Sequence, residues 1–244
     1  MKIVATIEAR MTSSRLPGKV LLDAAGKPML QHLINRLRAV PSINSIVLAT
    51  TINAADDVLV EFANRHDVLV YRGSELDVMG RVIGAARLAQ ADVVVEITGD
   101  CPIIDPDIVE QTIQMYLHND AVYVSNGHIR SYPDGMDTQV FGLDVLIQSA
   151  AMTTAPLDRE HVSLHIRSNP AVFPKLTLIA PPSLHWPELG LTLDEEADYK
   201  LLKKIIEKLA PENPLFSCLD VVRLLRKNPD WVAINQAVAR KGDA

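Results

Sequence analysis

The stretch ADVVVEI, residues 91–97, decides the fold of this chain. It is a short apolar run rich in β-branched valine, which is typical of a strand buried on both faces of a parallel sheet. The turn-forming residues TGDCP, 98–102, follow directly and end the run. We therefore expect residues 91–97 to form the central strand of a sheet and residues 98–102 to form the loop at its carboxyl end.

Toward the N-terminus, similar apolar runs alternate with segments of helical periodicity. Pro28 stands where the first turn of a helix accepts proline. Because alternating strands and helices are typical of crossover units, the predicted fold class is α/β with a mainly parallel central sheet. Strands are predicted at residues 3–7, 46–50 and 68–71, and helices at 29–37, 56–65 and 78–90.

Toward the C-terminus, the alternation becomes less regular after a helix predicted at 108–117. The region of about 124–187 is rich in turn formers and contains two predicted strands, at 138–141 and 173–179. We interpret it as an arm inserted in a single domain, 1–244, because no long linker bounds it. A short strand at 191–193 and helices at 194–209 and 218–226 complete the prediction.

The composition excludes several classes of protein. The 24 Lys and Arg against 30 Asp and Glu argue against broad electrostatic binding of nucleic acid. The two cysteines lack CxxC spacing, so neither a disulfide framework nor a thiolate metal site is expected. No apolar run approaches the ~20 residues that cross a bilayer, so we expect no membrane insertion. The first apolar run stops at Glu8, too short for a secretory signal, and a cytoplasmic location is expected.

A basic loop, ARMTSSRLPGKV at residues 9–20, follows the first predicted strand. Arg10 and Arg15 supply fork-shaped donors, Lys19 supplies a point charge, and backbone N–H groups of the loop can turn inward. This combination suits a triphosphate, although it matches neither the P-loop pattern nor GxGxxG. The alternative is a solvated basic loop. The loop 9–20 lies at the carboxyl end of a predicted strand, where parallel sheets bind ligands, and this position favours a binding site over a solvated loop.

Two acids at later strand ends are candidates for holding a cation. Asp100 follows the central strand, and Asp194 follows the predicted strand 191–193. Mg²⁺ on nucleotide phosphates needs only one or two protein carboxylates. Each acid also has a structural interpretation: Asp100 as a turn residue, and Asp194 as the N-cap of the helix that follows, without a Glu or Gln three residues later.

The remaining polar motifs give weaker signals. Asp134 and Asp137 lie in YPDGMD, which a solvated turn also explains. His161 and His165 are four residues apart but lack the HExxH pattern, so a zinc site is not indicated. No serine or cysteine stands in a GxSxG or comparable nucleophile motif, so covalent hydrolase chemistry has no support.

Taken together, six phrases of the sequence resemble a known enzyme family. In order between residue 2 and about 208, they are IEARMTSSRLPGKVL, YRGSELDV, ITGDCPIIDP, PDGMDTQVF, REHVSLHI and LTLDEEADY. They closely resemble the cytidylyltransferase family that contains the spore coat polysaccharide biosynthesis protein F, which is related to the CMP-Kdo and CMP-sialate synthetases. A lone RLPGK would be a weak match, whereas the ordered series is specific.

The resemblance implies a Rossmann-like, GT-A-like nucleotidyltransferase that uses CTP and Mg²⁺ to transfer CMP to a sugar acid, with release of pyrophosphate, in surface polysaccharide or glycan biosynthesis. It also implies a homodimer. The acceptor is expected to be a 2-keto acid sugar whose carboxylate pairs with Arg159 or Arg167. The residues implied for catalysis are Arg10, Arg15, Lys19 and Asp100; for the nucleotide Ala9, Arg10, Ser14, Arg15, Lys19, Arg72, Gly73, Ser74 and Arg81; for the metal Asp100 and Asp194; and for the acceptor Asp134, Asp137, Arg159, His161 and Arg167.

The sequence departs from the family pattern at three places. Gly80 stands where an acid usually precedes Arg81, Glu8 stands where an amide is more usual, and Glu195-Glu196 replace a Thr-Pro pair. Two alternatives therefore stay open. One is a GT-A-like glycosyltransferase, although TGDCP has one acid where such enzymes commonly have DxD. The other is a noncatalytic nucleotide-binding subunit of a polysaccharide pathway.

Overall fold

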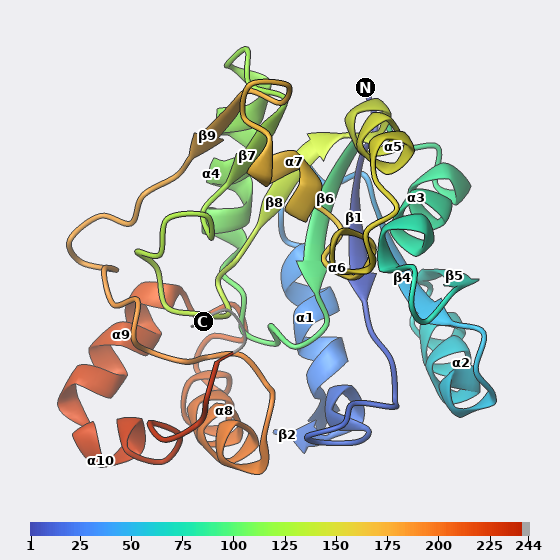
Figure 1. Cartoon of the computed structure of the whole chain (residues 1–244). Helices are drawn as coiled ribbons and strands as arrows, with labels where there is room; N and C mark the ends of the chain where they lie inside the picture. Colours follow the sequence, from blue (N-terminus) through green and yellow to red (C-terminus); the bar gives the residue numbers. More distant parts are fainter. Residues whose placement is uncertain (241–244) are drawn as a thin grey trace.

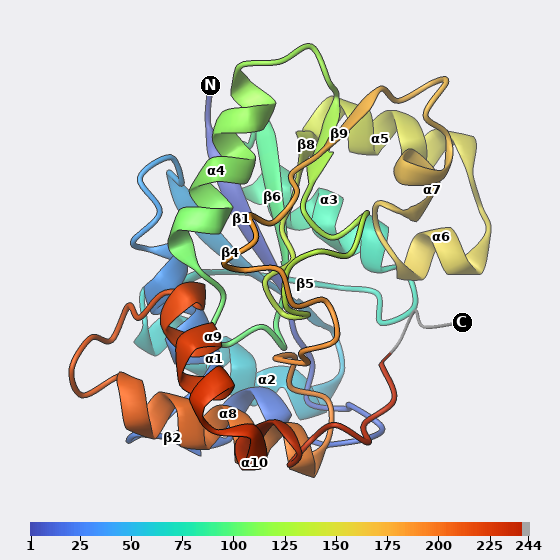
Figure 2. The ribbon, with the colours of Figure 1, turned by 90° about the vertical axis from the view of Figure 1, so that its left-hand side faces the viewer.

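The computed structural model describes residues 1–240 and shows one mixed sheet with helices on both faces (Figures 1 and 2). The last four residues of the predicted domain, 241–244, lie outside the described residues. The strand order in this sheet is β5-β4-β1-β6-β8-β7-β9. Its parallel part comprises β1 (Ile3–Glu8), β4 (Ser45–Thr51), β5 (Leu69–Gly73) and β6 (Val93–Thr98). The predicted α/β class with a mainly parallel sheet is confirmed.

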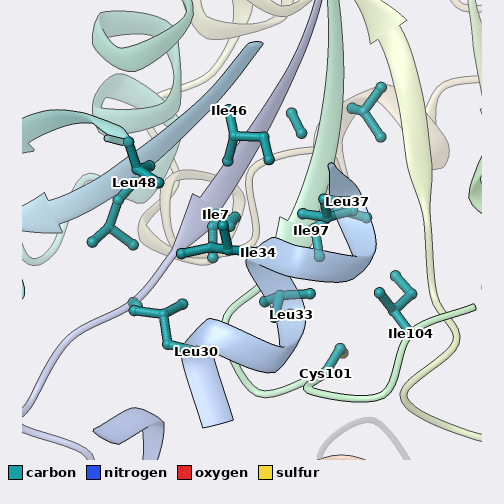
Figure 3. Close-up of a cluster of buried hydrophobic side chains, with 14 of the residues drawn as sticks. Ile7, Leu30, Leu33, Ile34, Leu37, Ile46, Leu48, Ile97, Cys101 and Ile104 are labelled. Carbon is teal, nitrogen blue, oxygen red and sulfur yellow. The ribbon is translucent and has the colours of Figure 1, made fainter. Parts of the chain in front are cut away.

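The central strand β6 is buried on both faces, as its sequence indicates. Val95 and Ile97 belong to one core cluster, which also contains the apolar face of α1, whereas Val94 belongs to a second cluster on the opposite face, with residues of α3 and α5. Figure 3 shows Leu33 and Ile34 of α1 packed against Ile7 and Ile97 at the ends of the two central strands. The helices of the parallel part are α1 (Met29–Leu37), α2 (Asp57–Arg65), α3 (Val78–Leu88) and α4 (Pro106–Leu117).

The region interpreted as an arm continues the same sheet. Strand β8 (Gln139–Gly142) pairs antiparallel with β6, β7 (Tyr123–Ser125) pairs antiparallel with β8, and β9 (Lys175–Thr177) pairs parallel with β7. Between β8 and β9 the chain forms α5 (Leu143–Met152) and two short helices, α6 (Pro156–Glu160) and α7 (Leu164–Ser168). The sequence did not indicate β7, whereas the segment 159–167, which it indicated as helix-like, forms parts of α6 and α7.

Two local predictions are wrong. The strand expected at 191–193 is absent, because the N–H of Leu191 donates to Asp134 and that of Leu193 to Asp100, so no ladder forms with either segment. Pro28 lies outside the first turn of α1: it precedes the helix and pairs with Asp23 in a small hairpin of β2 (Asp23–Ala24) and β3 (Lys27–Pro28). The other predicted elements are present with shifted ends.

The C-terminal helices pack beyond the carboxyl ends of the parallel strands (Figure 1). They are α8 (Glu196–Leu209), α9 (Cys218–Lys227) and α10 (Pro229–Val232), and two 3₁₀ turns lie earlier in the chain, η1 (Lys19–Leu21) and η2 (Ala54–Asp56). Within residues 1–240, every helix is too short or too polar to cross a membrane.

A buried arginine joins α1 to this C-terminal layer. The Arg36 side chain is 1% exposed, and its guanidinium donates to the carbonyls of Ile104 at 3.3 Å and Phe216 at 2.9 Å. The guanidinium also lies 4.0 Å from the centroid of the Phe216 ring, a cation–π contact. Burial lowers the pKa of Arg36 to about 10. Arg36 therefore connects three segments that are distant in the sequence: α1, the segment around Ile104 and the segment around Phe216.

Replacing Arg36 tests this connection. Arg36→Ala leaves two buried carbonyls without their donor and opens a cavity, so we expect the free energy of unfolding to fall by about 2–4 kcal/mol. Urea denaturation followed by circular dichroism measures the loss. Arg65→Ala, an exposed change on α2, is the matched control. Equal stability of the two variants would contradict a joining role for Arg36.

Candidate active site

A cavity of about 590 Å³ opens where β1 and β6 end. Its wall combines the loops after these strands with side chains from β7, β8 and the α6–α7 segment. The structure thus brings together residues that the sequence predicted from two separate loops and from the resemblance. Those lining the cavity are Ala9, Arg10, Ser14, Arg15, Lys19, Arg81, Asp100, Asp137, His161, Arg167 and Asp194.

Lys19 lies at the centre of the charged part of this cavity. Its Nζ is 3.0 Å from Asp100 Oδ2 and 3.0 Å from Asp194 Oδ1, and Arg15 lies 2.8 Å from the same Asp194 oxygen. The basic loop folds back on itself, since the N–H of Gly18 donates to Met11 at 2.9 Å and Gly18 adopts a φ of +71°. That left-handed conformation favours glycine. Lys19 follows as the first residue of η1, and its side chain faces the two acids.

Asp100 faces the cavity because its neighbour anchors the loop. Cys101 is 1% exposed and belongs to the same core cluster as Ile97, so the loop after β6 is fixed at its next residue. Gly99 permits the close approach of the first loop: a Cβ there would meet the carbonyl oxygen of Glu8 at 2.7 Å. The N–H of Leu193 donates to Asp100 at 2.8 Å and joins the two acidic segments.

Lys19 and the two aspartates, Asp100 and Asp194, stabilise one another's charged forms. Burial alone would raise the pKa of Asp100, but the Lys19 ammonium outweighs it and holds the pKa below the ordinary aspartate value. Burial likewise acts to lower the pKa of Lys19, and the attraction of Asp100 and Asp194 outweighs it, so this pKa is raised. We therefore expect the lysine to be charged and Asp100 to be ionised at neutral pH.

Asp194 does not cap α8, so the alternative interpretation of this acid as an N-cap is wrong. The N-cap is Glu195, and Asp198 accepts the backbone N–H groups of Asp194 at 3.1 Å and Glu195 at 2.9 Å. Asp198 is fully buried, and its other oxygen accepts from Arg240 at 2.7 Å and Asn235 at 2.8 Å. Because Glu195 and Asp198 form the capping box of α8, the carboxylate of Asp194 is free to face Lys19.

The two carboxylates fit a magnesium ion. They converge on a single cation, the Lys19 ammonium, and their oxygens are hard ligands of the kind that Mg²⁺ prefers. Within residues 1–240 there is no cluster of three or more His, Cys, Asp or Glu side chains placed to hold a metal. Two carboxylates suit Mg²⁺ when substrate phosphates and water fill the other positions.

Arg10 lies at the mouth of the cavity and is held from the opposite wall. It forms an ion pair with Glu75, which also accepts hydrogen bonds from Thr12 at 3.1 Å and from Asn53 at 2.7 Å. The hydrogen bonds from Asn53 and Thr12, together with Arg10, lower the pKa of Glu75. The side chain of Arg10 is 44% exposed, so it is accessible to a ligand.

Five residues implied by the resemblance do not line the cavity. Arg72 donates to the carbonyls of Thr51 and Asn53, both at 2.9 Å, and Arg159 forms two bonds with Asp77, at 2.8 and 2.6 Å. Their donors are thus engaged by local acceptors that hold neighbouring loops together. The other three are Gly73 in β5, Ser74, which accepts from the Asp77 N–H, and Asp134, which bonds to Thr192.

The inner wall of the cavity contains polar residues that sequence reasoning missed. Gln139 Oε1 accepts from the Tyr123 hydroxyl at 2.6 Å and from the Ser163 hydroxyl. Glu96, an acid within the apolar run 91–97, lines the same wall, and so does Glu8, which the sequence had singled out as a departure from the family pattern. The signal for Glu96 was its place at the carboxyl end of the central strand, where ligands gather.

The fold and this site define an α/β enzyme that handles phosphate groups at the carboxyl ends of parallel strands. The chain belongs to the cytidylyltransferase family, whose model matches residues 4–214.

Three comparisons place the chain within this family. It is 32% identical over 240 residues to the spore coat polysaccharide biosynthesis protein SpsF of Bacillus subtilis, covering 96% of this chain and 98% of that protein. It is 34% identical over 119 residues to the 3-deoxy-manno-octulosonate cytidylyltransferase of Trichlorobacter lovleyi, covering 49% of this chain and 46% of that protein. The structure of a cytidylyltransferase from Leptospira borgpetersenii is 30% identical, with a TM-score of 0.91 over 98% of this chain and 100% of that one.

The Lys19 ion pairs are testable through stability. Lys19→Met leaves two partly buried carboxylates facing each other, and we expect a loss of about 1–3 kcal/mol at pH 7. Because the pKa of Asp100 is lowered in the folded state, this stabilisation exists above the unfolded value of ~3.9 and disappears as the pH falls through the folded value. The stability curves of Lys19→Met and wild type should therefore converge at acid pH.

Urea denaturation between pH 7 and pH 3 checks this expectation. Lys200→Met, which removes an exposed lysine from an i,i+4 pair on α8, is the matched control. A gap between wild type and Lys19→Met that stays constant down to pH 3 would show that the loss comes from packing.

Proposed function

We propose that the chain transfers CMP from CTP to a hydroxyl of a sugar acid and releases pyrophosphate. The observation that carries this proposal is the meeting of Arg15 and Lys19 with Asp100 and Asp194 at one end of the cavity. A triphosphate with its divalent cation needs both kinds of charge within reach. Membership in the cytidylyltransferase family supports cytosine as the base.

The reaction is an in-line displacement at the α-phosphate. The oxygen of the acceptor hydroxyl forms a bond to phosphorus and loses its proton to water, the bond to the bridging oxygen breaks, and pyrophosphate leaves with the electron pair. Negative charge grows on the leaving group, and Arg10, Arg15 and Lys19 neutralise it. The cavity holds the acceptor beside the nucleotide, so positioning supplies much of the remaining acceleration.

Asp100 and Asp194 are the residues that would hold Mg²⁺. A bound Mg²⁺ orients the phosphates and polarises their oxygens. With a cation held by these two carboxylates, Lys19 and Arg15 would be available to pair with phosphate oxygens. The lysine thus keeps the acids together in the free protein and serves the nucleotide in the complex.

Arg167 is the better candidate for the acceptor carboxylate. It lines the cavity, and its Nε has no hydrogen-bond partner among the described residues, whereas Arg159 is bound to Asp77. The Trichlorobacter relative acts, by its name, on 3-deoxy-manno-octulosonate, which supports a 2-keto sugar acid as the acceptor class. The Bacillus relative supports a role in surface polysaccharide synthesis.

A screen for pyrophosphate release tests the proposal. The purified protein, CTP and Mg²⁺ are incubated with a panel of sugar acids, and the screen is repeated with each of the other nucleoside triphosphates. We expect pyrophosphate only with CTP, Mg²⁺ and an acceptor. Release of a nucleoside diphosphate from a nucleotide-sugar would instead identify a glycosyltransferase. CTP binding without turnover across the panel would identify a noncatalytic module.

Variants of the charged group sharpen this test. Lys19→Ala and Asp100→Asn should each lower pyrophosphate release by about a hundredfold or more, because each removes a charge aligned with the phosphates. Asp230→Asn, an exposed change on α10, is the control for expression and folding. Full activity in folded Lys19→Ala or Asp100→Asn would overturn the assignment.

We also propose that the protein acts as a homodimer in the cytoplasm, as the resemblance implies. Two large apolar side chains of the arm, Met152 and Leu157, are 50% and 59% exposed and lie at the α5–α6 junction, where a second copy could cover them. Sedimentation at micromolar concentration should give twice the mass of the 26.8 kDa chain. Met152→Glu with Leu157→Glu should give the monomer mass, and an unchanged dimer would exclude this surface.

A further inference from the structure

The last described residues of the chain contact both sides of the turn that carries Asp194. Arg240 donates to the Thr192 hydroxyl at 3.1 Å and to the Asp198 carboxylate at 2.7 Å. Only 11% of the Arg240 side chain is exposed, and the Asp198 side chain is fully buried. Each charge of a buried ion pair needs its partner, because water does not replace it. Arg240 is therefore fixed against the residues that flank Asp194 in the sequence.

A glycine makes room for this arginine. A Cβ at Gly190 would clash with the Arg240 guanidinium, so a side chain there would displace the arginine. The carbonyl of Gly190 accepts a hydrogen bond from the Asn235 amide at 2.9 Å, and the same amide donates to Asp198 at 2.8 Å. The C-terminal segment thus contacts both the strand-like approach to the turn and the helix that follows it.

Asp198 links Arg240 to the acid in the cavity. One of its oxygens faces Arg240, and the other accepts the backbone N–H groups of Asp194 at 3.1 Å and Glu195 at 2.9 Å. The Asp194 carboxylate lies 3.0 Å from the Lys19 ammonium. Because the backbone of Asp194 is bound to a carboxylate that Arg240 orients, Arg240 fixes the position of Asp194 without touching its side chain.

The same segment holds a cation of the basic loop. Arg15 donates to the carbonyl of Ala239 at 3.2 Å and lies 2.8 Å from Oδ1 of Asp194. The neighbours Ala239 and Arg240 thus support both members of this ion pair. The family model matches residues 4–214, so this support comes from a part of the chain that the model does not cover.

We propose that Arg240 is a positioning residue for the divalent cation of the site: through Asp198 it holds the Asp194 carboxylate where it binds the cation. Arg240 itself does not line the cavity. Groups that orient metal ligands are typically worth about 10–100-fold in metal affinity, because they fix the ligand before the metal binds. The proposal rests on the proposed function, which assigns Asp100 and Asp194 to the cation.

Calorimetry with CTP tests the proposal without turnover. The affinity for CTP is measured without an acceptor, once with Mg²⁺ and once with EDTA, and the ratio of the two affinities is the Mg²⁺ enhancement of CTP binding. We expect Arg240→Met to lower this enhancement about tenfold relative to wild type. An unchanged enhancement in the folded variant would overturn the proposal, and so would a wild-type protein whose CTP affinity does not depend on Mg²⁺.

Three further single variants identify the cause of the change. Arg240→Lys keeps a positive charge beside Asp198 and should retain more of the enhancement than Arg240→Met. Gly190→Ala displaces the Arg240 guanidinium and should lower the enhancement as Arg240→Met does, since the backbone of Gly190 is outside the left-handed region and accepts alanine. Lys227→Met, an exposed change on α9, is the matched control. If Arg240→Met does not fold, an unchanged enhancement in Gly190→Ala would refute the proposal.

A double variant separates positioning of Asp194 from a general structural role of Arg240. Asp194→Asn removes the acid that Arg240 holds in place, so adding Arg240→Met to Asp194→Asn should lower the enhancement no further. A further loss as large as that of Arg240→Met alone would show that Arg240 acts elsewhere in the molecule and would refute the positioning role.

Pyrophosphate release separates failure of this proposal from failure of the proposed function. An Mg²⁺ enhancement that depends on Arg240, without pyrophosphate release for any acceptor, would support the positioning role and refute CMP transfer. Pyrophosphate release that needs the same Mg²⁺ concentration for half its maximum rate in wild type and Arg240→Met would support CMP transfer and refute the positioning role.

Discussion

The Lys19 ammonium lies between two carboxylates that are far apart in the chain, and the charged site depends on this contact. Asp100 follows the central strand, Asp194 precedes α8, and each lies 3.0 Å from the same nitrogen. Without a cation, the two partly buried acids would repel each other. The fold must therefore bring positive charge to the edge where parallel strands end, and the loop after β1 does so.

The sequence predicted the parts of the fold that leave a local pattern. The run 91–97 has the composition of a strand buried on both faces, and two core clusters do cover it. The rule that ligands gather at the carboxyl ends of parallel strands then placed Lys19 and Asp100 near each other. The strand at 191–193 failed because its backbone donors reach two different segments, which no local pattern reveals.

The remaining parts of the site depend on long-range contacts. The carboxylate of Asp198 accepts the backbone N–H of Glu195, the N-cap of α8, while bound to Arg240, 42 residues away, and only the folded chain brings these groups together. Arg159 lies in a motif of the resemblance, but Asp77 occupies its donors. Glu96 is an acid in an apolar run, and its environment became clear only when β7, β8 and α7 closed the cavity around it. The residue types of Asp198, Arg159 and Glu96 alone do not show which of them line the cavity and which serve the structure.

The segment near residue 240 has a consequence for how the site is assembled. Arg240 bonds to Asp198 beneath the Asp194 turn, and Arg15 of the basic loop donates to the carbonyl of Ala239 at 3.2 Å. A nascent chain that has completed the sheet already contains Lys19 and Asp100, yet the turn bearing Asp194 lacks its support. The chain must be synthesised to about residue 240 before both acids are held in place, so the sheet can form before the charged site is complete.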